Sequence, residues 1–330
     1  MAPTKKGIEK GIRDKSIAAI SSWLKAEGLP HSANTRVQVV DRLAKLIGQD
    51  KLSEARFQEG LNSIEEASAK RIMLYEVGLE ELPRLRDTTA FARHLEGLNV
   101  SVSDSRRLAP TNPIRPTLVY VVHEPTQIRV KWAEGQIKTE VDLVTEQLIR
   151  TKTVKVVLLL VDTDTGFVEL RFDKPELIHI HRDSKQIPRS ARYFSYYQER
   201  ATEIVGTQLK PLELRGALRS LVETVPRIVR VETKDFRTGA NSRVRFVADT
   251  DVRDDEDWKA MYDEGGEQWA YDAEAVYWLP EASDNLLNRE VFTEIDARIG
   301  RLRVEADCHE GEIAYAVSRI REHKAKVSQP

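Results

Sequence analysis

Apolar residues in the first part of the chain recur with the spacing of amphipathic helices. Ile17, Ile20 and Leu24 lie three and four positions apart, so they share one face of a helix. The spacing continues in two further segments, which contribute Val37, Val40, Ala44 and Ile47, and then Phe57, Leu61, Ile64 and Ala67. The pattern predicts that the first 80 residues are helical, followed by a short helix from Thr88 to Leu98.

Two local sequence signals lie between the first two of these helices. Gly28-Leu29-Pro30 ends the first helix, because glycine supplies the left-handed cap and proline cannot continue the helix. Asn34 or Thr35 is a candidate N-cap for the second helix, because a short polar side chain can accept a hydrogen bond from the first turn. The sequence therefore predicts a helix, a short polar turn and a second helix.

The pattern changes after a proline-containing segment. Residues 105–116 hold three prolines and no apolar periodicity, which indicates a linker. Runs typical of strands then occupy 117–122, 127–132, 154–161, 167–172 and 177–181. Asp162 to Gly166 is the expected turn of a hairpin, and the intervening segment Glu140–Arg150 is predicted to be a helix.

The second half of the chain mixes both patterns. Two helices separated near Pro211 are predicted within 190–223, and a second hairpin within 228–247. Later segments predict helices near 256–262 and 289–299, a strand at 302–306 and a final segment at 312–323.

Together these elements predict an α+β protein, in which an N-terminal helical bundle precedes mixed or antiparallel sheet with packed helices. The predicted domains are a helical module at 1–100, a linker at 101–116, an α+β domain at 117–225 and a second one at 226–330.

Composition indicates where such a chain works. Cys308 is the single cysteine, so no intramolecular disulfide can form, which suits a reducing compartment. The longest apolar stretch, Val156 to Val161, has the length of a strand, and a membrane span needs about 18 such residues. The basic N-terminus lacks the apolar region of a secretory signal. We therefore expect a protein of the cytoplasm, nucleoid or nucleus that is not secreted and enters no membrane.

Charge is unevenly distributed along the chain. Residues 1–56 hold eleven Lys/Arg against six Asp/Glu, and residues 174–245 hold fifteen against eight. Residues 249–330 reverse this, with ten against twenty-one. Such asymmetry suggests a basic face for a polyanion and an acidic region for a basic protein partner.

The N-terminal helices carry a family resemblance. Residues 17–43, IAAISSWLKAEGLPHSANTRVQVVDRL, place Gly-Leu-Pro after a short helix and end a second helix in apolar, acidic, Arg and Leu positions. This segment resembles the SAP family of DNA-binding motifs. It departs from the family in a turn one residue longer, in Ala33 where the family has Gly, and in Arg36 where Lys is common. The resemblance implies contact with the DNA backbone.

The residue types support the same interpretation independently of the family. A helix N-terminus offers free N–H groups and a favourable dipole to a phosphate, and such contacts position a protein on a duplex without reading its sequence. The alternative is an ordinary corner of a helical bundle. The candidate DNA-contacting residues of this module are Lys25, His31, Ser32, Asn34, Thr35, Arg36 and Arg42.

A weaker resemblance concerns the order of the parts. About 80 helical residues, a linker and the strands of PTLVYVVHEPTQIRVKWA look somewhat like the CENP-N family of kinetochore proteins. That family pairs a death-fold-like bundle with a mixed sheet and binds nucleosomes. The resemblance again implies a basic groove between bundle and sheet.

Two later segments add basic candidates. A mixture that suits phosphates and exposed bases occupies residues 185–200, where Lys185, Arg189, Arg192 and Arg200 interleave with Tyr193, Phe194, Tyr196 and Tyr197. Alternatively, the tyrosines form a helix face that packs on the sheet. The hairpin contributes Arg230, Arg243 and Arg245, for which a solvated sheet face is the alternative.

Catalytic chemistry has weaker support. His179 and His181 share a strand face, but nothing nearby completes a metal site. Asp162 or Asp164 with Glu169 is the nearest approach to a metal-dependent nuclease, and Glu232 with Lys234 is the next. No phosphate-binding loop, nucleophile elbow or zinc-protease motif is present. We expect no cofactor and no metal.

The preferred hypothesis is a non-enzymatic DNA-binding protein that holds duplex DNA mainly through phosphates, in chromosome maintenance or in defence against foreign DNA. The alternatives are an adaptor subunit that uses its acidic C-terminal region, and a divalent-metal-dependent nuclease.

Overall fold

The structure is a computed structural model that describes residues 4–13, 15–67, 69–111, 113, 115–141, 148–173, 189–238, 240, 242–283 and 286–328. It confirms the α+β class, with helices at the N-terminus and strands that pair antiparallel in the registers resolved. The chain forms two compact units. Unit 1 combines Met1–Lys70 with Leu212–Pro330, and unit 2 is Arg71–Pro211.

These units cross the boundaries that the sequence suggested. The predicted N-terminal module of residues 1–100 is shared, because its first 70 residues belong to unit 1 and the rest to unit 2. Residues 101–111, the described start of the predicted linker, form no helix or strand.

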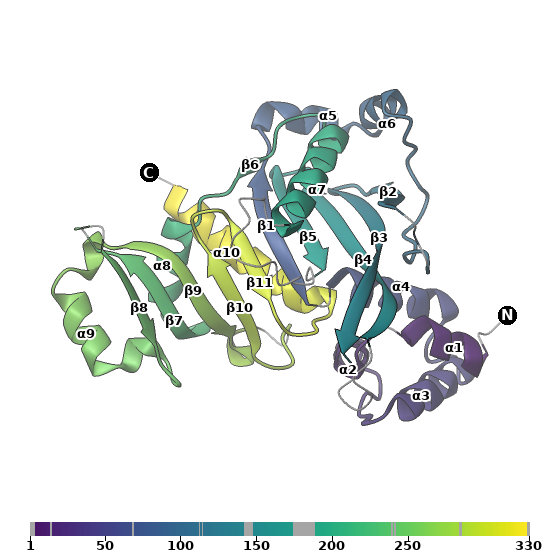
Figure 1. Cartoon of the computed structure of the whole chain (residues 1–330), viewed down its shortest axis with the longest axis horizontal. Coiled ribbons are helices and arrows are strands. Elements are labelled where there is room, and N and C mark those ends of the chain that lie inside the picture. Colours follow the sequence, from purple (N-terminus) through teal and green to yellow (C-terminus); the bar gives the residue numbers. More distant parts are fainter. Residues whose placement is uncertain are drawn as a thin grey trace. The chain divides into compact units, whose positions relative to one another are not determined.

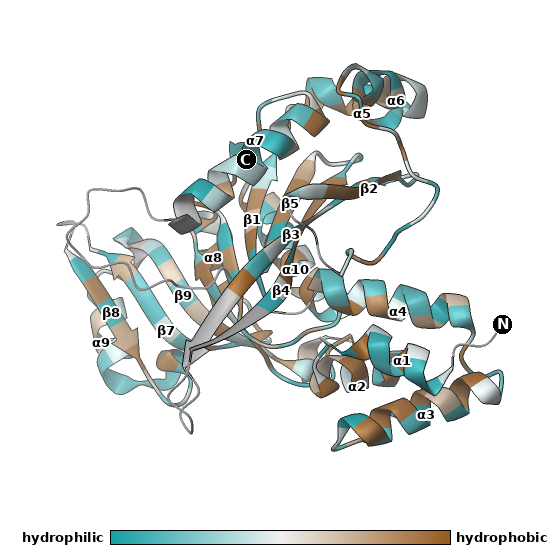
Figure 2. Cartoon of the chain, turned by 45° about the vertical axis from the view of Figure 1, so that its right-hand side comes forward, coloured by the Kyte–Doolittle hydropathy of each residue, from teal (hydrophilic) through white to brown (hydrophobic). Residues whose placement is uncertain are grey.

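Unit 1 begins with four helices: α1 (Lys5–Ile12), α2 (Ile17–Ala26), α3 (Arg36–Gly48) and α4 (Glu54–Ala67). Helices α2, α3 and α4 confirm the helices predicted from the apolar spacing, and Ile20, Leu43 and Leu61 are each buried. Val37, which the spacing placed on the apolar face of α3, is instead 70% exposed. Figure 2 shows the four helices grouped, with hydrophobic and hydrophilic positions alternating along each.

The second part of unit 1 is a sheet backed by helices. Its strands are β7 (Val229–Arg237), β8 (Arg243–Val247), β9 (Ala270–Trp278), β10 (Val291–Asp296) and β11 (Arg301–Val304), in the spatial order β11-β10-β9-β7-β8. Helices α8 (Arg215–Glu223) and α10 (Glu310–Ser328) pack against each other, and α8 contacts β9 and β7. Helix α9 (Glu256–Asp263) lies beside β8 (Figure 1).

Contacts between the two ends of the chain close unit 1. Helix α4 packs against α10. The buried Ser22 hydroxyl of α2 donates to Oε1 of Glu312 in α10 at 3.2 Å. The N-terminal helices and the C-terminal helix therefore share one interior.

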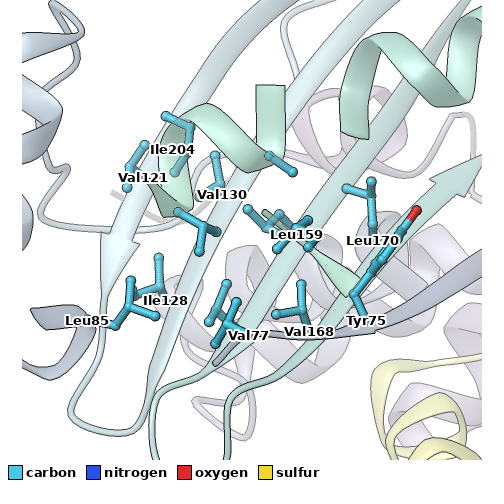
Figure 3. Packing of buried hydrophobic residues seen from close by; sticks show 14 of the residues in the cluster. Tyr75, Val77, Leu85, Val121, Ile128, Val130, Leu159, Val168, Leu170 and Ile204 are labelled. Carbon is cyan, nitrogen blue, oxygen red and sulfur yellow. The ribbon is translucent and has the colours of Figure 1, made fainter. Parts of the chain in front are cut away.

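Unit 2 contains a sheet in the order β2-β3-β4-β5-β1, with β6 (Lys210–Pro211) paired to β1 (Lys70–Glu76). The other strands are β2 (Thr117–His123), β3 (Gln127–Val141), β4 (Leu148–Asp162) and β5 (Phe167–Asp173). Its helices are α5 (Leu82–Arg86), α6 (Thr88–Gly97) and α7 (Arg189–Val205). Val130, Leu159 and Val168 of the strands and Ile204 of α7 belong to one buried cluster (Figure 3).

The turn between β4 and β5 confirms the predicted hairpin. Oδ1 of Asp162 accepts hydrogen bonds from the N–H groups of Asp164 and Thr165, both at 2.9 Å. Gly166 has a φ of +75°, which a glycine adopts without steric cost. The hairpin places the buried residues of both strands in the core of unit 2.

Three predicted helices proved wrong in whole or in part. Lys70–Glu76 is strand β1, although the first 80 residues were expected to be helical. The described ends of Glu140–Arg150 belong to β3 and β4, which pair as far as Val141 with Leu148. Val291–Asp296 forms β10 instead of a helix, because its strictly alternating burial suits a strand paired on both sides. Pairing with distant strands overrode the local pattern in each case.

Within the described ranges, no helix combines the length and apolar character needed to span a bilayer. The strand predicted at 177–181, with His179 and His181, lies outside those ranges.

Candidate nucleic-acid interface

The helix, polar turn and second helix predicted near the N-terminus form with the expected local geometry. Gly28 follows α2 with a φ of +68°. The N–H of Leu29 donates to the carbonyl of Leu24 at 2.8 Å, which closes the helix. The chain then runs through Pro30 and a polar turn to α3.

Of the two predicted N-cap candidates, Asn34 and Thr35, it is Thr35 that caps α3. Its hydroxyl accepts from the N–H of Gln38 at 3.3 Å. The side-chain oxygen of Gln38 in turn accepts from the N–H groups of Asn34 at 2.8 Å and Thr35 at 3.3 Å. This reciprocal capping box fixes the turn relative to α3. It also uses N–H groups that the sequence had suggested for phosphate binding.

A groove of about 710 Å³ lies between this turn and α3. The predicted residues Ser32, Asn34 and Arg42 line it, together with Lys45 and Lys51. Nη1 of Arg42 is buried and has no hydrogen-bond partner within the described part of the chain. An unpaired buried guanidinium nitrogen is costly, so this atom favours an acceptor from water or from a ligand.

The charge of the groove is positive. Among the described residues, the ion pairs of this module do not include Arg42, Lys45 or Lys51. Asp41 also lines the groove, but its carboxylate is held by Lys5 at 2.6 Å. The groove therefore combines hydroxyl, amide and cationic donors, which is the set that binds phosphate oxygens.

Other predicted residues of this module do not line the groove. Nη2 of Arg36 donates to the carbonyl of Lys15 at 2.8 Å, and Nη1 donates to that of Ile12. Arg36 therefore holds the end of α1. His31 Nδ1 lies 3.2 Å from the carbonyl of Leu29, and Lys25 is exposed on α2.

The cations of the second hairpin are largely neutralised by neighbouring groups. Arg230 pairs with Glu290 at 2.8 Å and stacks over the ring of Tyr277, whose centroid lies 4.0 Å away. Nε of Arg243 donates to Asp235 at 2.8 Å. Arg245 is exposed on β8. Asp235 on the neighbouring strand β7 and Glu290, just before β10, compensate most of the positive charge that the linear count assigned to this hairpin.

Asp272 anchors part of this compensation. Its buried carboxylate forms ion pairs with Nε of Arg237 at 2.7 Å and with Nη2 of Arg215 at 3.0 Å. Burial alone would raise the pKa of Asp272, but the hydrogen bonds and charges of the two arginines outweigh it and hold the pKa below the usual 3.8.

Asp272→Asn is expected to reduce the free energy of unfolding by roughly 1–3 kcal/mol at pH 7. A depressed pKa contributes stability above the unfolded-state value, and that contribution disappears as pH falls through the folded-state value. The difference between wild type and variant should stay constant from neutral pH to about pH 5 and narrow below the usual 3.8. Urea denaturation at several pH values checks this. A stability difference between wild type and variant that grows as the pH falls would contradict the prediction.

The aromatic residues near the start of α7 pack mainly inward. Tyr197 is fully buried, and its ring lies 5.9 Å from Trp132 and 6.3 Å from Phe172. Tyr193 lies 5.8 Å from Phe172. These two rings confirm the packing alternative, whereas Tyr196 remains 37% exposed.

Of Lys185, Arg189 and Arg192 in this segment, the structure describes the side chain of Arg192 alone. Arg192 is exposed on α7, Arg189 begins that helix, and Lys185 lies outside the described residues.

The residues considered for a nuclease are engaged elsewhere. Asp162 supports the hairpin turn, Asp164 pairs with Arg86 at 3.4 Å, and Glu169 pairs with Arg171 at 2.8 Å. Lys234, which the sequence paired with Glu232 as the second nuclease candidate, forms an ion pair with Glu274 instead. No group of three or more metal-ligating side chains gathers within the described ranges.

Sequence reasoning missed other residues that line the groove, among them Gln38, Lys45 and Lys51. Lys45 follows Arg42 by one helical turn, Lys51 lies three residues beyond the end of α3, and Gln38 is the N3 residue of the capping box. The spacing of Arg42 and Lys45 could have revealed a shared helix face. Lys51 gave no such signal, because only the fold brings it to the groove.

Comparison with known proteins adds no family assignment. The sequence matches no family model and no curated protein.

Proposed function

We propose that this protein is a non-enzymatic DNA-binding protein, and that the groove beside α3 holds phosphates of duplex DNA. The observation that carries the proposal is the grouping of Ser32, Asn34 and Arg42 with two lysines around one hollow. Among the described residues, the ion pairs of this module do not include these cations, so a polyanion can use their charge in full.

The mode of binding follows from the donor types. Lysine and arginine side chains, a hydroxyl and an amide contact backbone oxygens rather than base edges. We therefore expect weak sequence preference and strong dependence on salt. A duplex partner would place the protein with the nucleoid or the nucleus, and the resemblance of residues 17–43 to SAP motifs supports the same class of ligand.

The test is fluorescence anisotropy with a labelled duplex over a range of salt concentrations. Three or four neutralised phosphates give a slope of log K against log salt of about −3. Arg42→Gln/Lys45→Gln should reduce the magnitude of that slope by about 2 and weaken binding roughly tenfold at low salt.

Arg230→Gln/Arg243→Gln is the matched control, because it removes the same number of charges from residues that are already paired. We expect it to change the affinity by no more than about twofold. Absence of binding by the wild type, or an equal loss in both double variants, would refute the assignment of the groove.

A further inference from the structure

A second hollow lies in unit 1, away from the groove in sequence. It encloses about 470 Å³, within the range of roughly 300–1,000 Å³ typical of small-molecule sites. Aromatic side chains from α9 and β9 and a lysine from β7 line it, with charged residues at its margin; among them are Lys234, Trp258, Tyr262 and Tyr271.

The base of this pocket is rigid and aromatic. Lys234 is 1% exposed, and its ammonium donates to Glu274 at 3.0 Å. The same nitrogen lies 4.8 Å from the centroid of Trp258 and 4.6 Å from that of Tyr271. These contacts fix Lys234 between two rings, so the pocket surface behind it is preorganised.

Tyr262 adds a wall that a ligand can reach. Its side chain is partly exposed, and its ring lies 5.7 Å from Trp258. Its hydroxyl donates to Glu223 at 2.8 Å, which fixes the orientation of the ring. A flat ligand can stack on such a face, because aromatic pairs gain energy beyond simple burial.

The polar groups at the margin both donate and accept. Glu223 and Asp263 present carboxylate oxygens, and Lys259 presents an ammonium that also reaches the carbonyl of Asp254 at 2.9 Å.

Most charges here are compensated: Arg227 pairs with Asp254 at 2.8 Å, and Arg219 with Glu223 at 3.0 Å. A site with little net charge and mixed donors and acceptors favours an uncharged polar ring over a strong anion.

We propose that this pocket binds a heteroaromatic ring of the nucleobase type. Such a ring has a flat face for Tyr262 and an edge that both donates and accepts hydrogen bonds. The base can belong to a free nucleoside or to an unstacked position of a single strand. The inference does not rest on phosphate binding by the groove beside α3.

The experiment measures binding of adenosine, guanosine, cytidine and uridine by isothermal titration calorimetry, with ribose and indole for comparison. At least one nucleoside should bind with one-to-one stoichiometry, and ribose should not bind. A short single-stranded oligonucleotide, with and without one abasic position, distinguishes a base within a strand from a free nucleoside.

Tyr262→Ala should weaken this binding roughly tenfold, whereas Tyr277→Ala, which removes a partly exposed ring on β9 outside the pocket, should leave it unchanged. Lys259→Gln provides a second test at an exposed position, with an expected loss of several-fold. Arg42→Gln/Lys45→Gln should bind nucleosides as the wild type does, so failure of the groove and failure of the pocket are distinguishable.

Three outcomes overturn the proposal. The first is that neither nucleosides nor the oligonucleotide bind the folded wild type. The second is that binding occurs but is unaffected by both Tyr262→Ala and Lys259→Gln. The third is that indole binds as tightly as the best nucleoside, because the polar edge would then contribute nothing.

Discussion

Lys234→Met is expected to lower the free energy of unfolding by about 3–5 kcal/mol, since removing one partner leaves a buried charge uncompensated. The side chains of Lys234 and Glu274 are 1% and 0% exposed. Burial lowers the pKa of Lys234 and raises that of Glu274, although each partner opposes the effect on the other. Urea denaturation followed by circular dichroism measures the loss.

The double variant Lys234→Met/Glu274→Leu separates the ion pair from the packing. Replacing both members with apolar groups removes the unpaired carboxylate, so most of the lost stability should return. The coupling energy of the cycle should therefore exceed about 1 kcal/mol. A single variant as stable as the wild type would mean that the pair contributes little and that Glu274 is accommodated alone.

Tyr197→Ala is expected to reduce the stability of unit 2 by about 3–5 kcal/mol, as large-to-small changes of buried aromatic residues do. Tyr197 is fully buried against Trp132 and Phe172, and its hydroxyl donates to Glu134 at 3.2 Å. The variant removes both the packing and that hydrogen bond. Thermal and urea denaturation check the effect.

Tyr196→Ala is the matched control on the same helix. Its ring is 37% exposed, so we expect a loss of less than about 1 kcal/mol. Equal losses of stability in the two variants would contradict the prediction, because the buried Tyr197 would then contribute no more than the exposed Tyr196. Weaker nucleic-acid binding by Tyr196→Ala alone would instead restore this segment as a binding surface.

The sequence predicted helices well where one face carries the whole apolar pattern. Helix α2 follows such a face, whereas α3 buries Val40 and Ile47 of the predicted face but exposes Val37. The boundary residues Gly28 and Thr35 act as predicted. Strand β10 was mistaken for a helix, because its character comes from pairing on both sides. Local spacing does not contain that information.

The candidate interface was predictable only in part, for a related reason. Ser32, Asn34 and Arg42 do meet, because one turn and one helix position them. Arg36 and Arg243 have the same charge but are held by backbone carbonyls or a carboxylate from other segments. A linear count of charge does not reveal which cations have internal partners.

The joining of the two chain ends in unit 1 has a consequence for synthesis. Helices α1 to α4 emerge from the ribosome before α10, and Ser22 finds its partner 290 residues later, in α10. Until then, the side of α4 that meets α10 has no cover. Because domains generally fold as units during synthesis, unit 2 can complete its core while unit 1 waits for the last helix. A nascent chain stalled before α10 should therefore leave the α10-contacting surface of α4 open to chaperones.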